Sequence, residues 1–217
     1  MDADFWHQRW QSNQIAFHEG QANDLLVQYF RALCGGKERR IFLPLCGKTR
    51  DISWLMSKGY PVVGAELSEM AIKQLFQELE ITPRRSEIGS LIHYSADGID
   101  ILVGDIFDVS ADVLGRVDII YDRAALVALP DNMRSRYGSH LDHITSLAPQ
   151  FLLTFEYDQS LMDGPPFSVT EDEIRRCYGN QRNLKRIASV NVAGGLKGRC
   201  PATENLWMLT AEGSERR

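Results

Sequence analysis

The sequence predicts a doubly wound α/β fold, in which helices cover both faces of a mainly parallel sheet. Two observations lead to this fold class. Short apolar runs alternate along the chain with amphipathic segments, and residues 39–70 read in order as strand, tight turn, helix, strand, acidic residue and helix. The 217 residues are 44% hydrophobic and 24% charged. Those values are typical of a globular protein long enough for one domain with a proper core.

The first elements follow from local signals. Residues Asn23–Leu33 read as an amphipathic helix closed by two glycines. The apolar run Ile41–Leu43 is a buried strand, and the following Pro-Leu-Cys-Gly breaks it. Thr49 caps the next helix, because a hydroxyl before a helical run accepts a hydrogen bond from the first-turn amides. A proline then opens the strand Val62–Ala65.

The later elements continue the alternation. Ser68 caps a helix that runs to about Leu79, and the polar residues 83–98 read as an irregular insertion with a short hairpin. The further strands are 99–103, 117–121, 151–157 and a closing antiparallel pair, 184–192 and 204–209, which makes seven strands in all. The further helices are 132–147 and 170–178, the second with a capping box from Thr170 to Glu173.

The strand–turn–helix unit predicts a cofactor that contains a nucleoside. Glu66 ends the second strand about 20 residues after Gly47, the spacing at which an acidic side chain meets a ribose hydroxyl in doubly wound folds. The turn carries only one glycine, whereas a pyrophosphate needs a glycine-rich loop at a helix N-terminus. A ligand with a ribose but no phosphate, such as S-adenosylmethionine, therefore fits better. The alternative is that Glu66 is a surface residue at a strand end.

Five further motifs make the prediction specific. They are PLCGK from Pro44, VVGAELSE from Val62, DIFD from Asp105, YDRAALVALP from Tyr121 and GPPF from Gly164, preceded by W-x6-F-H from Trp10. In this order they closely resemble the thiopurine S-methyltransferase family, in particular its bacterial branch, over nearly the whole chain. The resemblance implies a class I methyltransferase: one domain over 1–217, with an N-terminal lid and helix at 1–36 and a Rossmann-like core at 37–217. It also implies S-adenosyl-L-methionine as cofactor.

The candidate cofactor contacts follow strand ends, where open α/β sheets bind ligands. The Leu45 backbone is expected to meet the methionine part of the cofactor, and Glu66 to accept hydrogen bonds from both ribose hydroxyls. Ile106 matches the family's adenine contact. The Asp105 side chain or the Ile106 amide would bond the adenine edge. For Ile106 and Phe107 the alternative is plain core packing.

Arg123 follows the fourth strand and has two functional interpretations. It could pair with the cofactor carboxylate, or its charge could lower the pKa of an acidic thiol substrate. The resemblance supports contacts with both ligands, so Arg123 is predicted as a cofactor-binding, substrate-binding and thiolate-stabilising residue. The alternative is a salt bridge with Asp122 or Asp118.

The N-terminal segment gathers aromatic residues. By resemblance, Trp10 covers the cofactor, where an indole face against a sulfonium is a favourable contact, and Phe17 lies on the substrate side. The alternative is a hydrophobic strap that seals the core. His7 and His18 are potential general bases, although a lone histidine is more often structural.

Two later segments border the substrate in the family. The basic loop Gly194–Pro201 departs from the animal sequences, so it is interpreted as a solvated loop and no arginine role is carried onto Arg199. The GPPF motif shapes the pocket wall or forms a rigid turn.

Bulk properties exclude several classes of function. The net charge of −5 provides no basic face for nucleic acid. The longest apolar runs are too short to span a bilayer, and the N-terminus lacks a signal peptide's apolar region. Four irregularly spaced cysteines indicate reduced thiols, with neither a disulfide framework nor a metal site. We therefore expect a cytoplasmic monomer that acts on a small molecule and holds no metal.

The expected reaction is methyl transfer from S-adenosylmethionine to the sulfur of thiopurines and of aromatic or heterocyclic thiols. By resemblance, selenium and tellurium compounds are further acceptors, in detoxification. Two alternatives stay open: a methyltransferase for another small acceptor, such as a halide or an amine, and a non-catalytic nucleoside-binding module.

Overall fold

The structure is a computed structural model that describes residues 3–14, 19–34 and 38–213. The chain divides into two compact units, residues 1–119 and 120–217, and each unit is described by itself. The single domain over 1–217, with its division at residue 36, stays a prediction.

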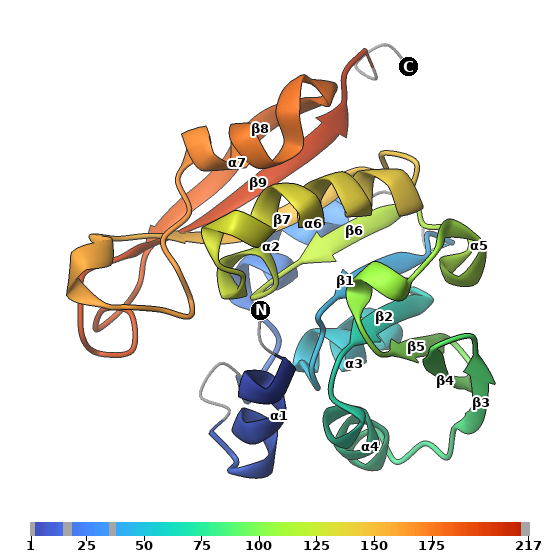
Figure 1. Cartoon of the computed structure of the whole chain (residues 1–217). Helices are drawn as coiled ribbons and strands as arrows, with labels where there is room; N and C mark the ends of the chain where they lie inside the picture. The colour runs from blue at the N-terminus through green and yellow to red at the C-terminus, as the bar shows by residue number, and fades with distance from the viewer. Residues whose placement is uncertain (1–2, 15–18, 35–37, 214–217) are drawn as a thin grey trace. The chain divides into compact units, whose positions relative to one another are not determined.

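The first unit holds five strands, which are hydrogen-bonded in the order β3-β4-β5-β2-β1 (Figure 1). Its strands are β1 (Ile41–Pro44), β2 (Val62–Glu66), β3 (Arg84–Ile88), β4 (Leu91–Ala96) and β5 (Ile99–Val103). β1, β2 and β5 run parallel, whereas β4 pairs antiparallel with β5 and with β3. Every residue of β1 and β2 is buried, as expected for parallel strands covered on both faces.

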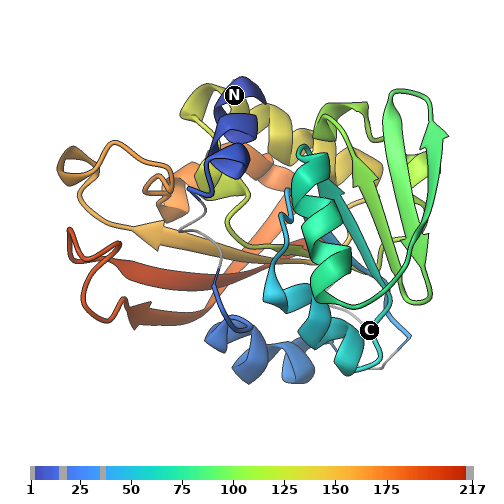
Figure 2. The ribbon, with the colours of Figure 1, turned by 90° about the horizontal axis from the view of Figure 1, so that it is seen from below.

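Helices accompany these strands. They are α1 (Ala3–Gln11), α2 (Asp24–Cys34), α3 (Arg50–Ser57), α4 (Glu69–Glu78), the short α5 (Ala111–Leu114) and the 3-10 turn η1 (Ile106–Asp108). α4 contacts β2 and β5, and α1 contacts α4. Figure 2 shows α4 in front of the strands of this unit, with the β3–β4 hairpin to its right. The N-terminal lid segment therefore begins with a helix that the sequence analysis did not predict.

Side-chain caps set the starts of the helices in this unit. The Asn23 Oδ1 accepts hydrogen bonds from the amides of Leu25 and Leu26. The hydroxyls of Thr49 and Ser68 accept from the amides two and three residues on, as N-caps do. The predicted starts of α3 and α4 are confirmed.

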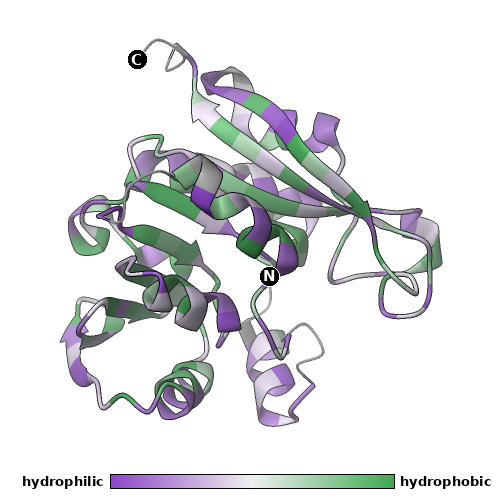
Figure 3. Cartoon of the chain, turned by 180° about the vertical axis from the view of Figure 1, so that it is seen from behind, coloured by the Kyte–Doolittle hydropathy of each residue, from purple (hydrophilic) through white to green (hydrophobic). Residues whose placement is uncertain are grey.

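The second unit holds four strands in the order β6-β7-β9-β8. They are β6 (Ile119–Asp122), β7 (Gln150–Glu156), β8 (Arg182–Asn191) and β9 (Thr203–Ala211). β6 and β7 are parallel, and β9 pairs antiparallel with both β7 and β8. Its main helices are α6 (Asp131–Ile144) and α7 (Glu171–Tyr178), with short 3-10 turns at 126–128 (η2), 159–161 and 179–181. The long strand pair beside the C-terminus alternates between hydrophobic and hydrophilic bands (Figure 3).

Two predicted features differ from the structure. The described residues contain nine strands where seven were expected, because the short hairpin expected within the irregular segment 83–98 is a regular antiparallel pair, β3 and β4. Gly89 supplies the positive φ of 61° that its tight turn requires. The capping box is wrong: the Thr170 side chain makes no cap hydrogen bond, and the Glu173 carboxylate pairs with Arg134 on α6.

Two further observations bear on the bulk predictions. Over the part of the chain that the structure describes, no helix has the length and apolar character needed to cross a bilayer. All four cysteines are buried free thiols.

Candidate functional site

Glu66, the last residue of β2, is 7% exposed, and two backbone amides hold its carboxylate. Its Oε2 accepts from the Gly47 amide at 2.8 Å and its Oε1 accepts from the Ser68 amide at 2.8 Å. Burial raises the pKa of this carboxyl, while the amide hydrogen bonds act in the opposite direction. The surface-residue alternative for Glu66 is therefore wrong. Each carboxylate oxygen can accept more than one hydrogen bond, so the group can also accept from neighbouring hydroxyls.

The turn after β1 is conformationally strained. Leu45 has φ of 48° and Gly47 has φ of 53°, both in the left-handed region. The region is unfavourable for leucine and is often occupied at functional sites. The Cys46 amide donates to the Ala65 carbonyl at 3.0 Å, which ties the turn to β2. This geometry brings the turn beside Glu66, as a cofactor-binding role for the Leu45 backbone requires.

Trp10 lies directly over this turn. Its side chain is 4% exposed, and a Cβ added to Gly47 would lie 3.2 Å from the indole Cζ2. That contact, together with the positive φ of Gly47, explains why a glycine stands there. The N-terminal helix is thereby attached to the turn between β1 and α3, as expected of a cover over a ligand at these strand ends.

A cavity of about 320 Å³ opens at the carboxyl ends of β2 and β5. Its walls include Leu67, Ser68 and Gly104 from the strand ends, and Trp10 and His7 from α1. Of the predicted cofactor contacts, Trp10 lines this cavity, whereas Glu66 and Ile106 lie within two residues of the lining segments 67–70 and 103–104 without lining it. The volume lies at the lower end of the range for small-molecule sites. The histidine that the sequence analysis weighed as a base is thus a cavity-lining residue on the cover helix.

The end of β5 forms another wall of this region. Gly104 has φ of 148°, and a Cβ there would lie 2.5 Å from Leu91 Cδ2, so the position requires glycine. Asp105 is exposed, and its Oδ1 accepts from the Phe107 amide at 3.0 Å, which caps η1. Ile106 is buried. The adenine contacts predicted for the Asp105 side chain and for Ile106 stay predictions.

These residues of the first unit fit S-adenosylmethionine. A buried carboxylate suits the paired ribose hydroxyls, a partly apolar cavity suits a flat nucleobase, and an indole suits a sulfonium. The fit depends on Glu66, on the turn at Gly47 and on the cavity wall at Gly104. The other cofactor contacts predicted in this unit are Trp10, Leu45, Asp105 and Ile106, and the direct ligand contacts of all of them, Glu66 included, stay predictions.

Arg123 lies in the second unit, next to a fully buried aspartate. Asp122 Oδ1 accepts from the Leu126 amide at 3.1 Å, and its Oδ2 accepts from the Tyr137 hydroxyl at 2.8 Å. Burial raises the pKa of the Asp122 carboxyl to about 6. Arg123 is half-buried, and Ala124 follows with φ of 59°. The backbone that carries Arg123 is therefore held in an unusual conformation at the end of β6.

This raised pKa predicts how folding stability depends on pH. Protonated Asp122 is favoured in the folded state, so its contribution is fully present below pH 4 and is lost as pH rises through about 6. The Asp122→Asn variant has no carboxyl group that could titrate at this position. Its free energy of unfolding, measured in urea from pH 4 to 8, should rise relative to wild type by up to about 3 kcal/mol. A matched Asp112→Asn variant at an exposed position should show no such trend. A difference independent of pH would contradict the prediction.

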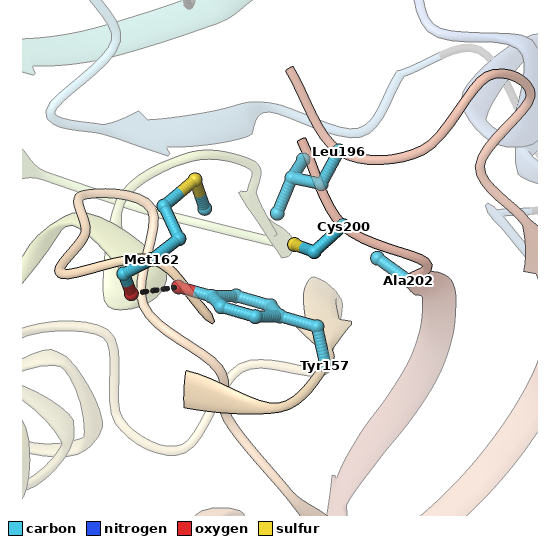
Figure 4. Packing of buried hydrophobic residues seen from close by; sticks show 5 residues of the cluster. All are labelled: Tyr157, Met162, Leu196, Cys200 and Ala202. Atoms are coloured by element: carbon cyan, nitrogen blue, oxygen red, sulfur yellow. Dashed lines mark hydrogen bonds between the residues drawn. The ribbon is translucent and has the colours of Figure 1, made fainter. Parts of the chain in front are cut away.

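The glycine-rich loop near the C-terminus is not wholly solvated, which corrects the sequence interpretation. Leu196 and Cys200 are buried in a small hydrophobic cluster with Tyr157, Met162 and Ala202. Figure 4 shows these side chains pointing toward one another, with the Tyr157 hydroxyl donating to the Met162 carbonyl at 3.4 Å. The loop is held in place because Leu196 and Cys200 are buried in the same cluster as Tyr157.

The rest of this loop meets the GPPF motif. The Lys197 ammonium donates to the Pro165 carbonyl at 2.7 Å, whereas Arg199 is exposed. The loop thus anchors the proline turn, and Arg199 receives no role. Phe17 and His18 lie outside the described residues, so the predictions for them stay untested.

The contribution of α1 to the cavity was not predicted beyond Trp10. His7 and Gln11 line it beside Trp10. The signal was present: Trp6 and Trp10, four residues apart, have the spacing of one helix face. A short segment with aromatic side chains among polar residues is easily interpreted as irregular structure.

Comparisons with known proteins agree with this site. A family model described as thiopurine S-methyltransferase matches residues 1–207. The thiopurine S-methyltransferase of Xanthobacter autotrophicus is 52% identical over 210 residues, covering 96% of this chain and 99% of that protein. That of Teredinibacter turnerae is 48% identical over 212 residues, covering 97% and 98%.

A solved structure shows the same fold. The 1,6-didemethyltoxoflavin-N1-methyltransferase of Burkholderia thailandensis, with bound 1,6-didemethyltoxoflavin and S-adenosylhomocysteine, matches with a TM-score of 0.66 at 13% identity. The match covers 97% of this chain and 87% of that chain. The Rossmann-like class I fold is confirmed. The family match agrees with a Glu66 carboxylate that two backbone amides hold and with the PLCG turn after β1. The chain belongs to the thiopurine S-methyltransferase family of S-adenosylmethionine-dependent methyltransferases.

Proposed function

We propose that this protein methylates the sulfur of thiopurines and of other aromatic or heterocyclic thiols, and that selenium and tellurium compounds are further acceptors. The main observation behind this proposal is the buried Glu66 carboxylate, which the amides of Gly47 and Ser68 hold at the end of β2. It supplies a ribose-binding group in a chain whose relatives, at 48–52% identity, are named thiopurine S-methyltransferases.

In the first unit, the residues bind and cover the cofactor. Glu66 accepts hydrogen bonds from the ribose hydroxyls, the strained backbone at Leu45 meets the methionine portion, and Ile106 lies against the adenine. S-adenosylmethionine supplies an electrophilic methyl group when bound. Trp10, buried over the turn, excludes water, and a dry site strengthens the electrostatic interactions within it.

In the second unit, Arg123 acts on the acceptor. A guanidinium near a thiol favours the thiolate, so its charge lowers the acceptor's pKa. Aromatic thiols and heterocyclic thiones are already acidic and need little help from a base. Orientation of the two reactants then contributes most of the rate acceleration.

We propose a small-molecule acceptor, a monomeric enzyme and a cytoplasmic location. A net charge of −5 is unfavourable for binding polyanions, and four buried free thiols suit a reducing compartment.

An acceptor panel tests the function. Purified protein with methyl-labelled S-adenosylmethionine is incubated with a thiopurine, an aromatic thiol, a selenol, an aniline, a phenol and iodide. Label is expected on sulfur and selenium, with kcat/KM at least about tenfold higher than for amine, phenol or halide. A preference for halide or amine would replace the proposed acceptor class. Cofactor binding without turnover of any acceptor would favour the non-catalytic module.

A further inference from the structure

Helix α6 holds the start of the segment that carries Arg123. The Tyr137 hydroxyl donates to Asp122 Oδ2 at 2.8 Å. The Gln150 amide donates to the same oxygen at 3.3 Å and to the Tyr178 hydroxyl at 2.8 Å. Asp122 and Tyr137 are both fully buried. The residue before Arg123 is therefore fixed from β7 and from α6.

The same helix holds the end of that segment. The Arg134 Nε donates to the Leu129 carbonyl at 2.8 Å, and its guanidinium forms an ion pair with Glu173 on α7. Arg134 is only 3% exposed. Tyr137 and Arg134 are three residues apart on α6, so they lie on one face of the helix. Residues 122–129 are thus held at both ends from one helix face.

The GPPF turn contacts both the 122–129 segment and Arg134. The Phe167 amide donates to the Val127 carbonyl at 2.7 Å, and the Arg134 guanidinium lies 5.3 Å from the centre of the Phe167 ring. Such a contact is favourable when the cation is shielded from water. Arg134 therefore makes three interactions at once, with the 122–129 segment, with the GPPF turn and with α7.

Burying a charged arginine is costly, and a well-packed apolar residue is often at least as stabilising. What an apolar residue lacks is the planar fork that joins a carbonyl, a carboxylate and a ring in one geometry. The arrangement of Arg134 is therefore better explained by placement of the attached segments than by stability alone.

We infer that Arg134 and Tyr137 are positioning residues for the acceptor side of the reaction. Together they set the backbone at Asp122–Leu129, and hence the place of the Arg123 guanidinium, while Arg134 also sets the place of Phe167. This inference rests on the proposed function.

The test compares Arg134→Lys and Tyr137→Phe with wild type, with Arg136→Met as an exposed control on the same helix. For each variant, KM for a heterocyclic thiol, the cofactor dissociation constant and the thermal midpoint are measured. Arg134→Lys keeps the charge and loses the fork. We expect its thiol KM to rise about tenfold, with a smaller change in cofactor affinity, because Arg123 is the one predicted cofactor contact on the held segment. Tyr137→Phe should show the same pattern with a smaller change.

A double-mutant cycle separates positioning from general stability. If Arg134 acts by placing Arg123, then Arg134→Lys should lower kcat/KM much less in an Arg123→Met background than in wild type. The inference would be overturned if the losses of kcat/KM were additive, or if the thiol KM stayed unchanged in both variants. It would also be overturned if thiol turnover and cofactor binding fell together in proportion to the folded fraction of the protein. If Arg134→Lys does not fold, the same cycle with Tyr137→Phe decides. Wild-type protein that methylates no thiol would instead overturn the proposed function.

Discussion

Replacing Glu66 with alanine is expected to weaken S-adenosylmethionine binding by about 1.5–3 kcal/mol, because charge-assisted hydrogen bonds to both ribose hydroxyls are lost. The structure adds a second cost. The Gly47 and Ser68 amides, both bonded to this carboxylate at 2.8 Å, lose their partner. The turn that Trp10 covers should therefore loosen, so turnover should fall further than cofactor affinity alone predicts.

Calorimetric titration with S-adenosylmethionine checks the affinity, and thermal unfolding reports the lost amide partners. Glu66→Gln keeps a carbonyl for one amide but presents an NH2 group to the other, so it should be intermediate in cofactor affinity. The exposed Glu87→Ala serves as the matched control on the same unit. A folded Glu66→Ala protein with wild-type cofactor affinity would remove Glu66 from the site.

Replacing Arg123 with methionine is expected to lower kcat/KM for an acidic thiol by about 10- to 100-fold, the size of a lost charge-assisted interaction. The guanidinium favours the thiolate, so its removal should raise the acceptor's pKa in the complex. The rising limb of the pH–rate profile should then move to higher pH. Arg123→Lys keeps the charge without the planar fork, and its loss should be partial.

The measurement is kcat/KM from pH 5 to 9 with two thiols of different acidity. Methionine should affect the less acidic thiol more, because that thiol depends more on the cation. Arg116→Met, at an exposed position, provides the control. Full activity with an unmoved profile in the Arg123→Met protein, with amines as better acceptors than thiols, would contradict the chalcogen assignment.

Local signals explain why much of the fold was predictable. The strand 99–103 was predicted with the bounds it has in the structure, and the helices after Thr49 and Ser68 begin where the caps indicated. Caps, prolines and apolar periodicity act over a few residues, so they can be read without knowing what packs where. The same holds for Glu66, whose place at a strand end follows from β2 alone.

Longer-range contacts decided the features that the sequence interpretation got wrong. Thr170 and Glu173 satisfy the capping-box pattern, yet Glu173 pairs with Arg134 across to α6. That partner lies on another helix, so no local pattern records it. Residues 84–96 differ from the prediction in another way: the expected short hairpin is present, but it is regular and its second strand also pairs with β5.

By itself, then, the sequence determined the alternation of strands and helices, the acidic strand end at Glu66 and, through its motifs, the methyltransferase family. Only the tertiary structure decided that two amides hold the Glu66 carboxylate, that Trp10 lies over Gly47, and that one face of α6 holds both ends of the segment carrying Arg123. The physical reason is the same in each case. These contacts join residues from different elements, and their energies depend on distance and burial, which no local pattern records.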